Sequence, residues 1–336
     1  MNSNAKIAIV ILNYKGWKDT LECIESLYSQ EYKNFRIILV ENYSENESLN
    51  KFKEYMNGEL PLESEYFLHN KTIKKIPYIQ YNTEEALQGG ISEKESYLNS
   101  FQLNEGIVLI NNSENLGFSG GNNIGAKYAY KCGYEYVLLL NNDTLVIDKD
   151  FLQKLIQPFE IYDHVFLTGP QINNFDATFD GPFIEDTFLG NLFYLSLLNF
   201  FRRRLNCPSI YIDIKAISSP RAVPVFKISG ACLMFDTKRL HELDYLDENV
   251  WLSSEEAILA EKIKAKNGKI IFQPLTTLIH KKAQSPRPKA DKYNILKNHY
   301  EQRKYFNKHY RKYGFFQMGI IELMTKIRLL LVKIKG

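Results

Sequence analysis

Four short apolar runs in the first 140 residues constrain the fold of this chain most strongly. They are residues 6–12 (KIAIVIL), 35–40 (FRIILV), 106–110 (GIVLI) and 136–140 (YVLLL). Near-continuous apolar runs of this length are typical of strands buried on both faces. Residues 17–30, 44–56 and 120–132 lie between the runs and are predicted to be helices. The alternation predicts an α/β fold with a mostly parallel sheet flanked by helices.

Two segments interrupt this alternation. Residues 58–105 are weakly periodic and contain several prolines and glycines, so we predict an excursion at the sheet edge with a short helix near 83–87. Residues 188–201 (FLGNLFYLSLLNFF) are strongly apolar and precede three arginines. They are too few to span a bilayer, which needs roughly 20 residues. They fit either a core or lid helix, or an element that faces a membrane or an acceptor.

Further predicted elements extend the α/β region to about residue 285. Residues 223–235 contain a strand and a turn of small residues, and 254–266 form a helix that ends at Asn267-Gly268. Residues 269–272 and 276–279 are predicted to be two short strands.

The net charge of +3 conceals an asymmetry along the chain. Residues 281–336 contain 15 Lys/Arg and 3 Asp/Glu, so the preceding region is acidic. From 314 to 335, apolar residues are interspersed with basic ones, which predicts a basic amphipathic helix. This helix would dock on an anionic membrane surface or pack on the α/β domain. Nucleic acid is not an expected partner, because no recognised binding motif is present.

The cysteines bear on the cellular compartment. The chain has four, widely scattered and without a C-x-x-C pair, so neither a zinc site nor a disulfide framework is expected. This usage favours a reducing, cytoplasmic compartment.

Polar residues follow each of the four predicted strands. The segments are 12–14 (LNY), 41–44 (ENYS), 111–123 (NNSENLGFSGGNN) and 141–144 (NNDT). Open parallel sheets bind ligands at the carboxyl ends of their strands, so these segments predict a polar ligand site. Turns favour the same residue types, so any one of these segments alone could be an ordinary turn. Their occurrence at the same place after four successive strands favours a ligand site. The glycine-rich loop 115–123 matches neither the dinucleotide-binding nor the P-loop pattern.

Three positions carry chemistry that such a site needs. Asp143 follows an apolar strand, where its carboxylate suits Mg²⁺ or Mn²⁺ bound to a diphosphate; a helix cap or turn is the alternative. His280 ends the last predicted strand and would bind the metal or the diphosphate, unless its role is structural. Glu255-Glu256 open a helix, where one carboxylate would act as general base; interaction with the helix dipole is the alternative.

These motifs, in this order, resemble glycosyltransferase family 2, and in particular its bacterial rhamnosyltransferase-like members. The resemblance is carried by residues 10–14 (VILNY), 40–44 (VENYS), 115–123 (NLGFSGGNN), 139–144 (LLNNDT), 229–232 (SGAC), 246–249 (LDEN), 255–256 (EE) and 280–285 (HKKAQS). It implies a GT-A fold, a Rossmann-like mostly parallel sheet flanked by helices. The implied catalytic domain is 1–285, with insertions at about 58–105 and 175–220, followed by a basic helical extension at 286–336.

The resemblance also implies roles for individual residues. Those that would bind the nucleotide part of a donor are Leu12, Asn13, Tyr14, Glu41, Asn115, Gly117 and Asn142. Asn142 and Asp143 stand at the D-x-D position, so Asp143 is the implied metal ligand. Glu256 stands at the catalytic base position, with Glu255 as its rival because the pair is Glu-Glu rather than Glu-Asp.

The implied activity is transfer of a sugar from a nucleotide-diphosphate sugar, dTDP-rhamnose or a UDP-sugar, to a hydroxyl group. The acceptor would be a lipid-linked or growing glycan of a surface polysaccharide (O-antigen or capsule). One base and one Mg²⁺ or Mn²⁺ ion fit a single displacement that inverts the anomeric centre. The enzyme would be peripheral on the cytoplasmic face of the plasma membrane. The alternatives are a sugar nucleotidyltransferase, or an inactive module that binds sugar nucleotides or membranes.

Overall fold

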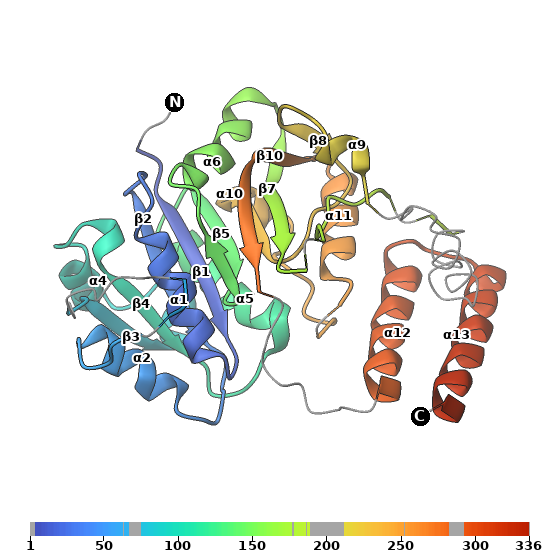
Figure 1. Ribbon diagram of the computed structural model, residues 1–336, viewed down its shortest axis with the longest axis horizontal. Helices are drawn as coiled ribbons and strands as arrows, with labels where there is room; N and C mark the ends of the chain where they lie inside the picture. The colour runs from blue at the N-terminus through green and yellow to red at the C-terminus, as the bar shows by residue number, and fades with distance from the viewer. Residues whose placement is uncertain are drawn as a thin grey trace.

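A single central sheet organises the protein, as its computed structural model shows (Figure 1). The structure describes residues 4–62, 64–66, 75–176, 178–185, 187–188, 212–251, 253–281 and 292–335, and the sheet has ten strands within them. The strands are β1 (Ile7–Asn13), β2 (Phe35–Glu41), β3 (Tyr78–Asn82), β4 (Ile107–Asn111), β5 (Tyr136–Asn141), β6 (Thr144–Val146), β7 (Val165–Asn174), β8 (Val223–Val225), β9 (Cys232–Asp236) and β10 (Lys269–His280). Their order is β3-β4-β2-β1-β5-β9-β7-β10-β6, and β8 pairs with β10.

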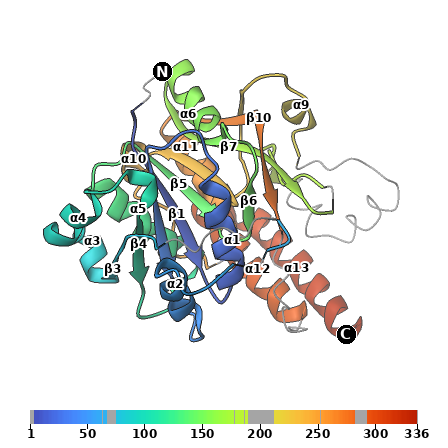
Figure 2. The same ribbon diagram turned by 60° about the vertical axis from the view of Figure 1, so that its left-hand side comes forward.

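Helices cover both faces of this sheet (Figure 2). They are α1 (Trp17–Leu27), α2 (Ser48–Met56), α3 (Thr83–Leu87), α4 (Ser92–Leu98), α5 (Gly117–Lys131), α6 (Phe151–Ile161), α9 (Ile214–Ile217), α10 (Thr237–Glu242), α11 (Glu255–Ala265), α12 (Lys292–His309) and α13 (Phe315–Lys335), with a 3₁₀ turn at Leu103–Glu105. One apolar core contains α1, α2 and α6, and the other contains α3, α5, α10 and α11. Residues of β1 alternate between them, with Ile9 in the first core and Val10 in the second. The predicted α/β architecture is confirmed.

The register of the parallel strands brings their carboxyl ends to one edge. Asn13 pairs with Glu41, and Glu41 pairs with Asn111. On the other side of β1, Leu12 pairs with Asn141. The polar segments that follow four apolar strands in the sequence are therefore neighbours in space, as predicted.

The segment 58–105 contributes the edge of the sheet. β3 pairs with β4 in parallel and is the last strand on that side. The predicted helix at 83–87 is confirmed as α3, and it begins with a capping box in which Asn82 and Glu85 satisfy each other's backbone N–H groups. The second interruption, residues 188–201, lies outside the described residues apart from Phe188.

The prediction of two short strands at 269–272 and 276–279 is wrong, because β10 is one strand with an irregularity. Its register against β7 shifts between Gln273 and Thr277, on either side of Pro274. Proline removes a ladder hydrogen bond and is tolerated at bulges, so the sequence pattern breaks although the strand continues. The oxygen Oδ2 of Asp148 accepts the Thr277 N–H at 2.8 Å and stabilises the bulge. Residues 223–235 likewise contain two strands, β8 and β9, instead of one.

The two last helices form a pair that contacts the α/β body. In both views the pair lies at the end of the molecule opposite α3 and α4 (Figures 1 and 2). Phe306 of α12 is fully buried against Val250 and Ile258. Just beyond α12, the Arg311 guanidinium donates to the Glu261 carboxylate of α11. α13 coincides with the predicted amphipathic helix, and no helix within the described residues meets the length and hydropathy of a membrane span.

Candidate functional site

A buried polar network ties the ends of β1 and β2 together. The Asn13 Nδ2 group donates to the Glu41 carboxylate and to Ser44 Oγ, the latter at 3.2 Å. The other Glu41 oxygen accepts the Ser44 N–H at 2.7 Å. Asn13 and Glu41 are almost completely buried, and Leu12 is partly buried beside them. These side chains hold the loops at the ends of the two strands, whereas Tyr14 is 47% exposed.

A second network, centred on Asn42, shapes the glycine-rich loop. The Asn42 Nδ2 group donates to Asn115 Oδ1 (2.9 Å) and to the Gly117 carbonyl (3.2 Å). Its Oδ1 accepts from Asn112 Nδ2 at 3.0 Å and from the Leu116 N–H at 3.2 Å. Gly117 has φ of +68°, which favours glycine. Asn115 and Gly117, both expected at the site, are therefore brought together by a residue of the β2 end.

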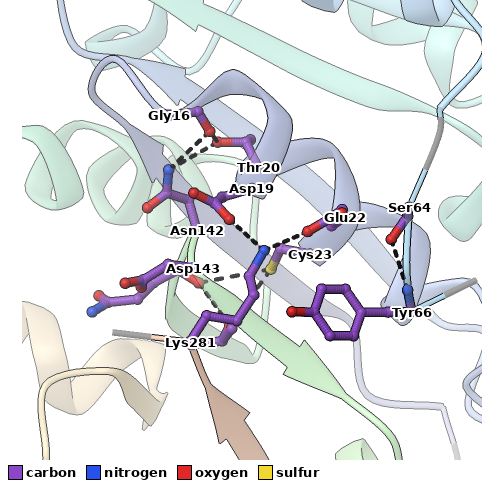
Figure 3. Close-up of polar contacts among 12 residues, drawn as sticks. Gly16, Asp19, Thr20, Glu22, Cys23, Ser64, Tyr66, Asn142, Asp143 and Lys281 are labelled. Atoms are coloured by element: carbon purple, nitrogen blue, oxygen red, sulfur yellow. Dashed lines mark hydrogen bonds and ion pairs between the residues drawn. The ribbon is translucent and has the colours of Figure 1, made fainter. Parts of the chain in front are cut away.

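The D-x-D position is joined to the first network through α1. Asn142 Nδ2 donates to Thr20 Oγ1 at 3.0 Å (Figure 3). The Thr20 hydroxyl in turn donates to Asn13 Oδ1 at 2.8 Å. Thr20 is fully buried in α1. Asn142 is thereby held in place by the helix that follows the first strand.

Asp143, the next residue, belongs to a group of titratable side chains. His280, the last residue of β10, places Nε2 at 3.2 Å from Asp143 Oδ1 and Nδ1 at 3.5 Å from Asp180 Oδ2. Burial lowers the pKa of His280, but its contacts with the two carboxylates outweigh burial and raise the pKa to about 9. The imidazole therefore carries a positive charge between two acids when no metal is bound.

The donor set of Asp143 and His280 fits a divalent cation that a substrate helps to hold. Carboxylate oxygen and imidazole nitrogen are both ligands of such ions. Among the described residues, no group of three or more His, Cys, Asp or Glu side chains is arranged to hold a metal. Mg²⁺ commonly binds through one or two carboxylates and completes its coordination with water and substrate phosphates. The residues present therefore fit Mg²⁺ or Mn²⁺ bound together with a diphosphate.

Lys281 secures this end of the site to α1. Its backbone N–H donates to the Asp143 carbonyl at 2.9 Å. Its ammonium group contacts the carboxylates of Asp19 and Glu22, the latter at 2.6 Å (Figure 3). Only 3% of the Lys281 side chain is exposed, and it lies over the ring of Tyr66. This cluster holds β10 and the Asp143 turn against α1.

The acidic pair lies beside the same group. The Gly230 N–H donates to Glu256 Oε1 at 3.1 Å, and Ser229 Oγ donates to Asp180 Oδ2 at 3.0 Å. Adjacent residues of one turn therefore contact both Glu256 and the acid that faces His280. Burial and the charge of Glu256 raise the pKa of Glu255 to about 8. In the part of the chain that the structure describes, Glu255 Oε2 is buried without a hydrogen-bond partner.

Trp251, four residues before Glu255 in the chain, contacts the glycine-rich loop. Its carbonyl accepts the Phe118 N–H at 3.1 Å, and a Cβ atom on Gly117 would lie 3.1 Å from its ring. Half of the residue remains exposed. Ser254, which precedes α11, has φ of +70°, so the backbone enters this helix through a strained residue. The arrangement places an exposed aromatic side chain against the glycine-rich loop.

None of the sequence patterns identifies Asp180, Lys281 or Trp251 as a site residue. Asp180 precedes Gly181-Pro182, a signal for a turn that carries no information about His280. Lys281 stands in the 280–285 motif and begins the basic segment, but neither pattern predicts its contact with α1. Trp251 is one of two tryptophans and stands shortly before the acidic pair, which is the one signal that could have found it.

Solved structures with this architecture define the class of the fold. The crystal structure of GalNAc-T7 with UDP, GalNAc and Mn²⁺ matches with a TM-score of 0.55 at 15% identity, covering 93% of this chain and 50% of that one. The mannosyltransferase PcManGT from Pyrobaculum calidifontis, in complex with GDP-Man and Mn²⁺, matches with a TM-score of 0.52 at 11% identity, covering 96% and 69%. The fold is therefore that of GT-A glycosyltransferases, and the chain spans half the length of GalNAc-T7.

The sequence places the chain within that class. The family described as Glycosyl transferase family 2 matches residues 8–72 and 93–218, more than half of the chain. The protein belongs to this family. A comparison with curated protein sequences finds no match.

Proposed function

We propose that this protein is an inverting, metal-dependent glycosyltransferase that uses a nucleotide-diphosphate sugar, either dTDP-rhamnose or a UDP-sugar. One observation carries the proposal. Contacts run without interruption from Asp143 through His280 and Asp180 to the Ser229–Gly230 turn and on to Glu256. The candidate metal ligands and the candidate base are thus held next to each other on one framework. Family membership and the fold support the same assignment, as do the ligands of the two similar structures, which are UDP, GalNAc and Mn²⁺ in one and GDP-Man and Mn²⁺ in the other.

The donor would lie across the carboxyl edge of the sheet. Tyr14 would offer its exposed ring to the nucleobase of the donor. The side chains that hold the surrounding loops are Asn13, Glu41 and Asn142. Asp143 and His280 would hold the divalent cation against the diphosphate. When bound, this cation stabilises the negative charge that develops on the leaving nucleoside diphosphate.

The acidic pair would activate the acceptor. We assign the general base to Glu256, which would take the proton of the acceptor hydroxyl as its oxygen attacks the anomeric carbon. The Gly230 N–H orients this carboxylate. Glu255 has its pKa raised to about 8, so it is mostly protonated near neutral pH and a second negative charge is avoided. General base assistance contributes roughly 10²–10⁴-fold. Attack from the side opposite the leaving group inverts the configuration without a covalent enzyme intermediate.

The acceptor in this proposal is a lipid-linked or growing glycan of a surface polysaccharide, on the cytoplasmic face of the plasma membrane. Two features support it. Trp251 is half exposed and precedes the acidic pair by four residues in the chain, and aromatic faces suit the apolar face of a sugar. The chain also ends in a strongly basic helical pair, and anionic membranes attract such segments.

A donor screen by NMR, with Mg²⁺ or Mn²⁺ and a set of UDP- and dTDP-sugars, tests the proposal. We expect metal-dependent binding of one donor and slow hydrolysis or transfer by the wild type. Asp143→Ala should lose metal-dependent binding. Glu256→Gln should bind the donor normally and lose at least about 10²-fold in transfer, the lower range of general base assistance. Asp150→Ala, in the neighbouring turn, is the matched control. Failure of every nucleotide sugar to bind would overturn the assignment.

A further inference from the structure

We propose that one face of α13 is a docking surface for an anionic lipid bilayer. The proposal deepens the proposed function, because a bilayer would supply the lipid-linked acceptor. Docking itself, however, needs no catalytic activity and is tested separately. The surface consists of five apolar residues that we call the outer strip: Phe316, Ile320, Leu323, Ile327 and Leu330.

The outer strip is a continuous, exposed apolar face of α13. Its residues recur at intervals of four and three, so they line one side of the helix. Each is substantially exposed, from 39% for Ile327 to 84% for Phe316. Phe315, adjacent at the start of the helix, is 89% exposed. Scattered exposed apolar residues are ordinary, but an aligned row over four turns marks an interaction surface.

The strip is not needed to hold α13 in place. Ile321, on another side of the helix, is 4% exposed and packs with Tyr300 of α12. Leu296 and Leu329 complete this contact between the two helices. α13 is therefore attached to α12 by one apolar face and presents a second one outward.

Charge decides which partner fits the strip. Residues 292–335 contain 11 Lys/Arg and 2 Asp/Glu, so the helical pair is strongly basic. Lys326 is 71% exposed and lies at the border of the strip, about two turns before Lys333. A second copy of the chain would bring an equal positive charge to the contact. An anionic bilayer is complementary in both respects, because it accepts the apolar side chains and attracts basic residues by about 1 kcal/mol each.

Contacts of α12 and the residue after it with the α/β body would fix the position of the acidic pair relative to the bilayer. His299 Nδ1 and Ser253 Oγ share a hydrogen bond at 2.7 Å, two residues before Glu255. The Tyr310 hydroxyl donates to Asp247 Oδ2 at 2.6 Å, four residues before Trp251. A bilayer bound to α13 is therefore held in a defined position relative to the segment that leads into α11.

Vesicle flotation tests the docking surface directly. The full chain is mixed with vesicles of phosphatidylcholine alone or with about one third phosphatidylglycerol, at low and high salt. We expect the wild type to float with the anionic vesicles and to be released by salt. Leu323→Glu/Ile327→Glu should lower the bound fraction at least about tenfold, because it places two charges in the apolar face. Ile161→Glu, which charges an exposed isoleucine of α6, should float like the wild type.

Two further measurements separate this proposal from its competitors. Thermal unfolding and donor binding should be unchanged in Leu323→Glu/Ile327→Glu, which shows that the variant is folded and that its donor site is intact. Because flotation does not depend on glycosyl transfer, the docking proposal and the proposed function can fail independently. Light scattering gives the oligomeric state of each variant. Equal flotation of the strip variant and the wild type would overturn the proposal. A wild-type dimer that the strip substitutions convert to a monomer would assign the strip to a second copy instead.

Discussion

Glu255 and Glu256 are neighbours in the chain, yet their carboxylates have different surroundings. Glu256 accepts a backbone N–H, whereas one oxygen of Glu255 is buried without a partner among the described residues. A carboxylate in such surroundings retains its proton to higher pH, because desolvation and a like charge both disfavour ionisation. The two residues are therefore suited to different tasks, although the sequence presents them as equivalent.

This difference predicts how stability depends on pH. Burial and Glu256 raise the pKa of Glu255 from 4.5 to about 8, so the folded state binds the proton more tightly than the unfolded state does. Rising pH therefore destabilises the fold between these two values, by roughly 1.4 kcal/mol per unit. Glu255→Gln cannot ionise and should be more stable than the wild type at pH 8, with little difference at pH 4.

Thermal unfolding across this pH range gives the measurement. Glu84→Gln, which neutralises an exposed carboxylate of α3, is the control and should not change the slope. Glu255→Gln should also retain transfer near neutral pH, because glutamine resembles the protonated acid. A Glu255→Gln variant whose advantage is the same at pH 4 and pH 8 would contradict the placement of the proton on Glu255.

At the scale of elements, β10 and α1 are joined by charge as well as by packing. Lys281 and Glu22 are separated by most of the chain, but their side chains are 3% and 7% exposed and lie 2.6 Å apart. The pair adjoins the Asp143 turn through the Lys281 backbone. A buried pair contributes little net stability compared with apolar residues, but loss of one partner leaves the other charge buried and unpaired.

We predict that Lys281→Met lowers the free energy of unfolding by about 3–5 kcal/mol. Addition of Glu22→Gln to this variant should restore much of the loss, because the second substitution removes the unpaired charge. Lys51→Met is the control: its ion pair with Glu54 is 29% and 39% exposed, so its removal should cost at most about 1 kcal/mol. Urea unfolding measures all three. Equal effects of Lys51→Met and Lys281→Met would contradict the importance of burial.

At the scale of the whole molecule, the sheet brings candidate ligand-binding groups from both halves of the chain to one edge. Asp143 follows β5, whereas His280 ends β10, more than 130 residues later. A ligand that contacts both residues would bind only to the folded state. Its binding therefore stabilises the entire fold by mass action.

We predict that Mn²⁺ and UDP together raise the midpoint of thermal unfolding, and that each alone has a smaller effect. The physical reason is that only two protein side chains, Asp143 and His280, would hold the ion, so substrate phosphates would have to contribute to its binding. Ligand at about 100 times its Kd stabilises the fold by about 2.7 kcal/mol. Asp143→Ala should abolish the joint effect, and Asp150→Ala should preserve it. A full shift with Mn²⁺ alone would mean that the protein holds the ion without a substrate.

The sequence by itself determined the elements that depend on local patterns. Apolar runs predicted β1, β2, β4 and β5 to within one residue at each end, because a strand buried on both faces needs such a run. Asparagines, glycines and acids placed after those strands predicted that these polar segments would lie together at one edge, because parallel strands end on the same side. The motifs in this order were enough to indicate the family that the comparison shows.

Only the tertiary structure decided how distant segments meet. Asp180 reaches His280 from a turn after β7, Lys281 reaches back to α1, and α12 packs beside α11. β10 continues past Pro274 because its neighbours β7 and β6 pair with it on the far side of the bulge. None of these contacts has a local signature, because each depends on the registry of elements many residues apart. Local periodicity records which face of a segment is buried, but the partner that buries it is chosen by the packing of the whole chain.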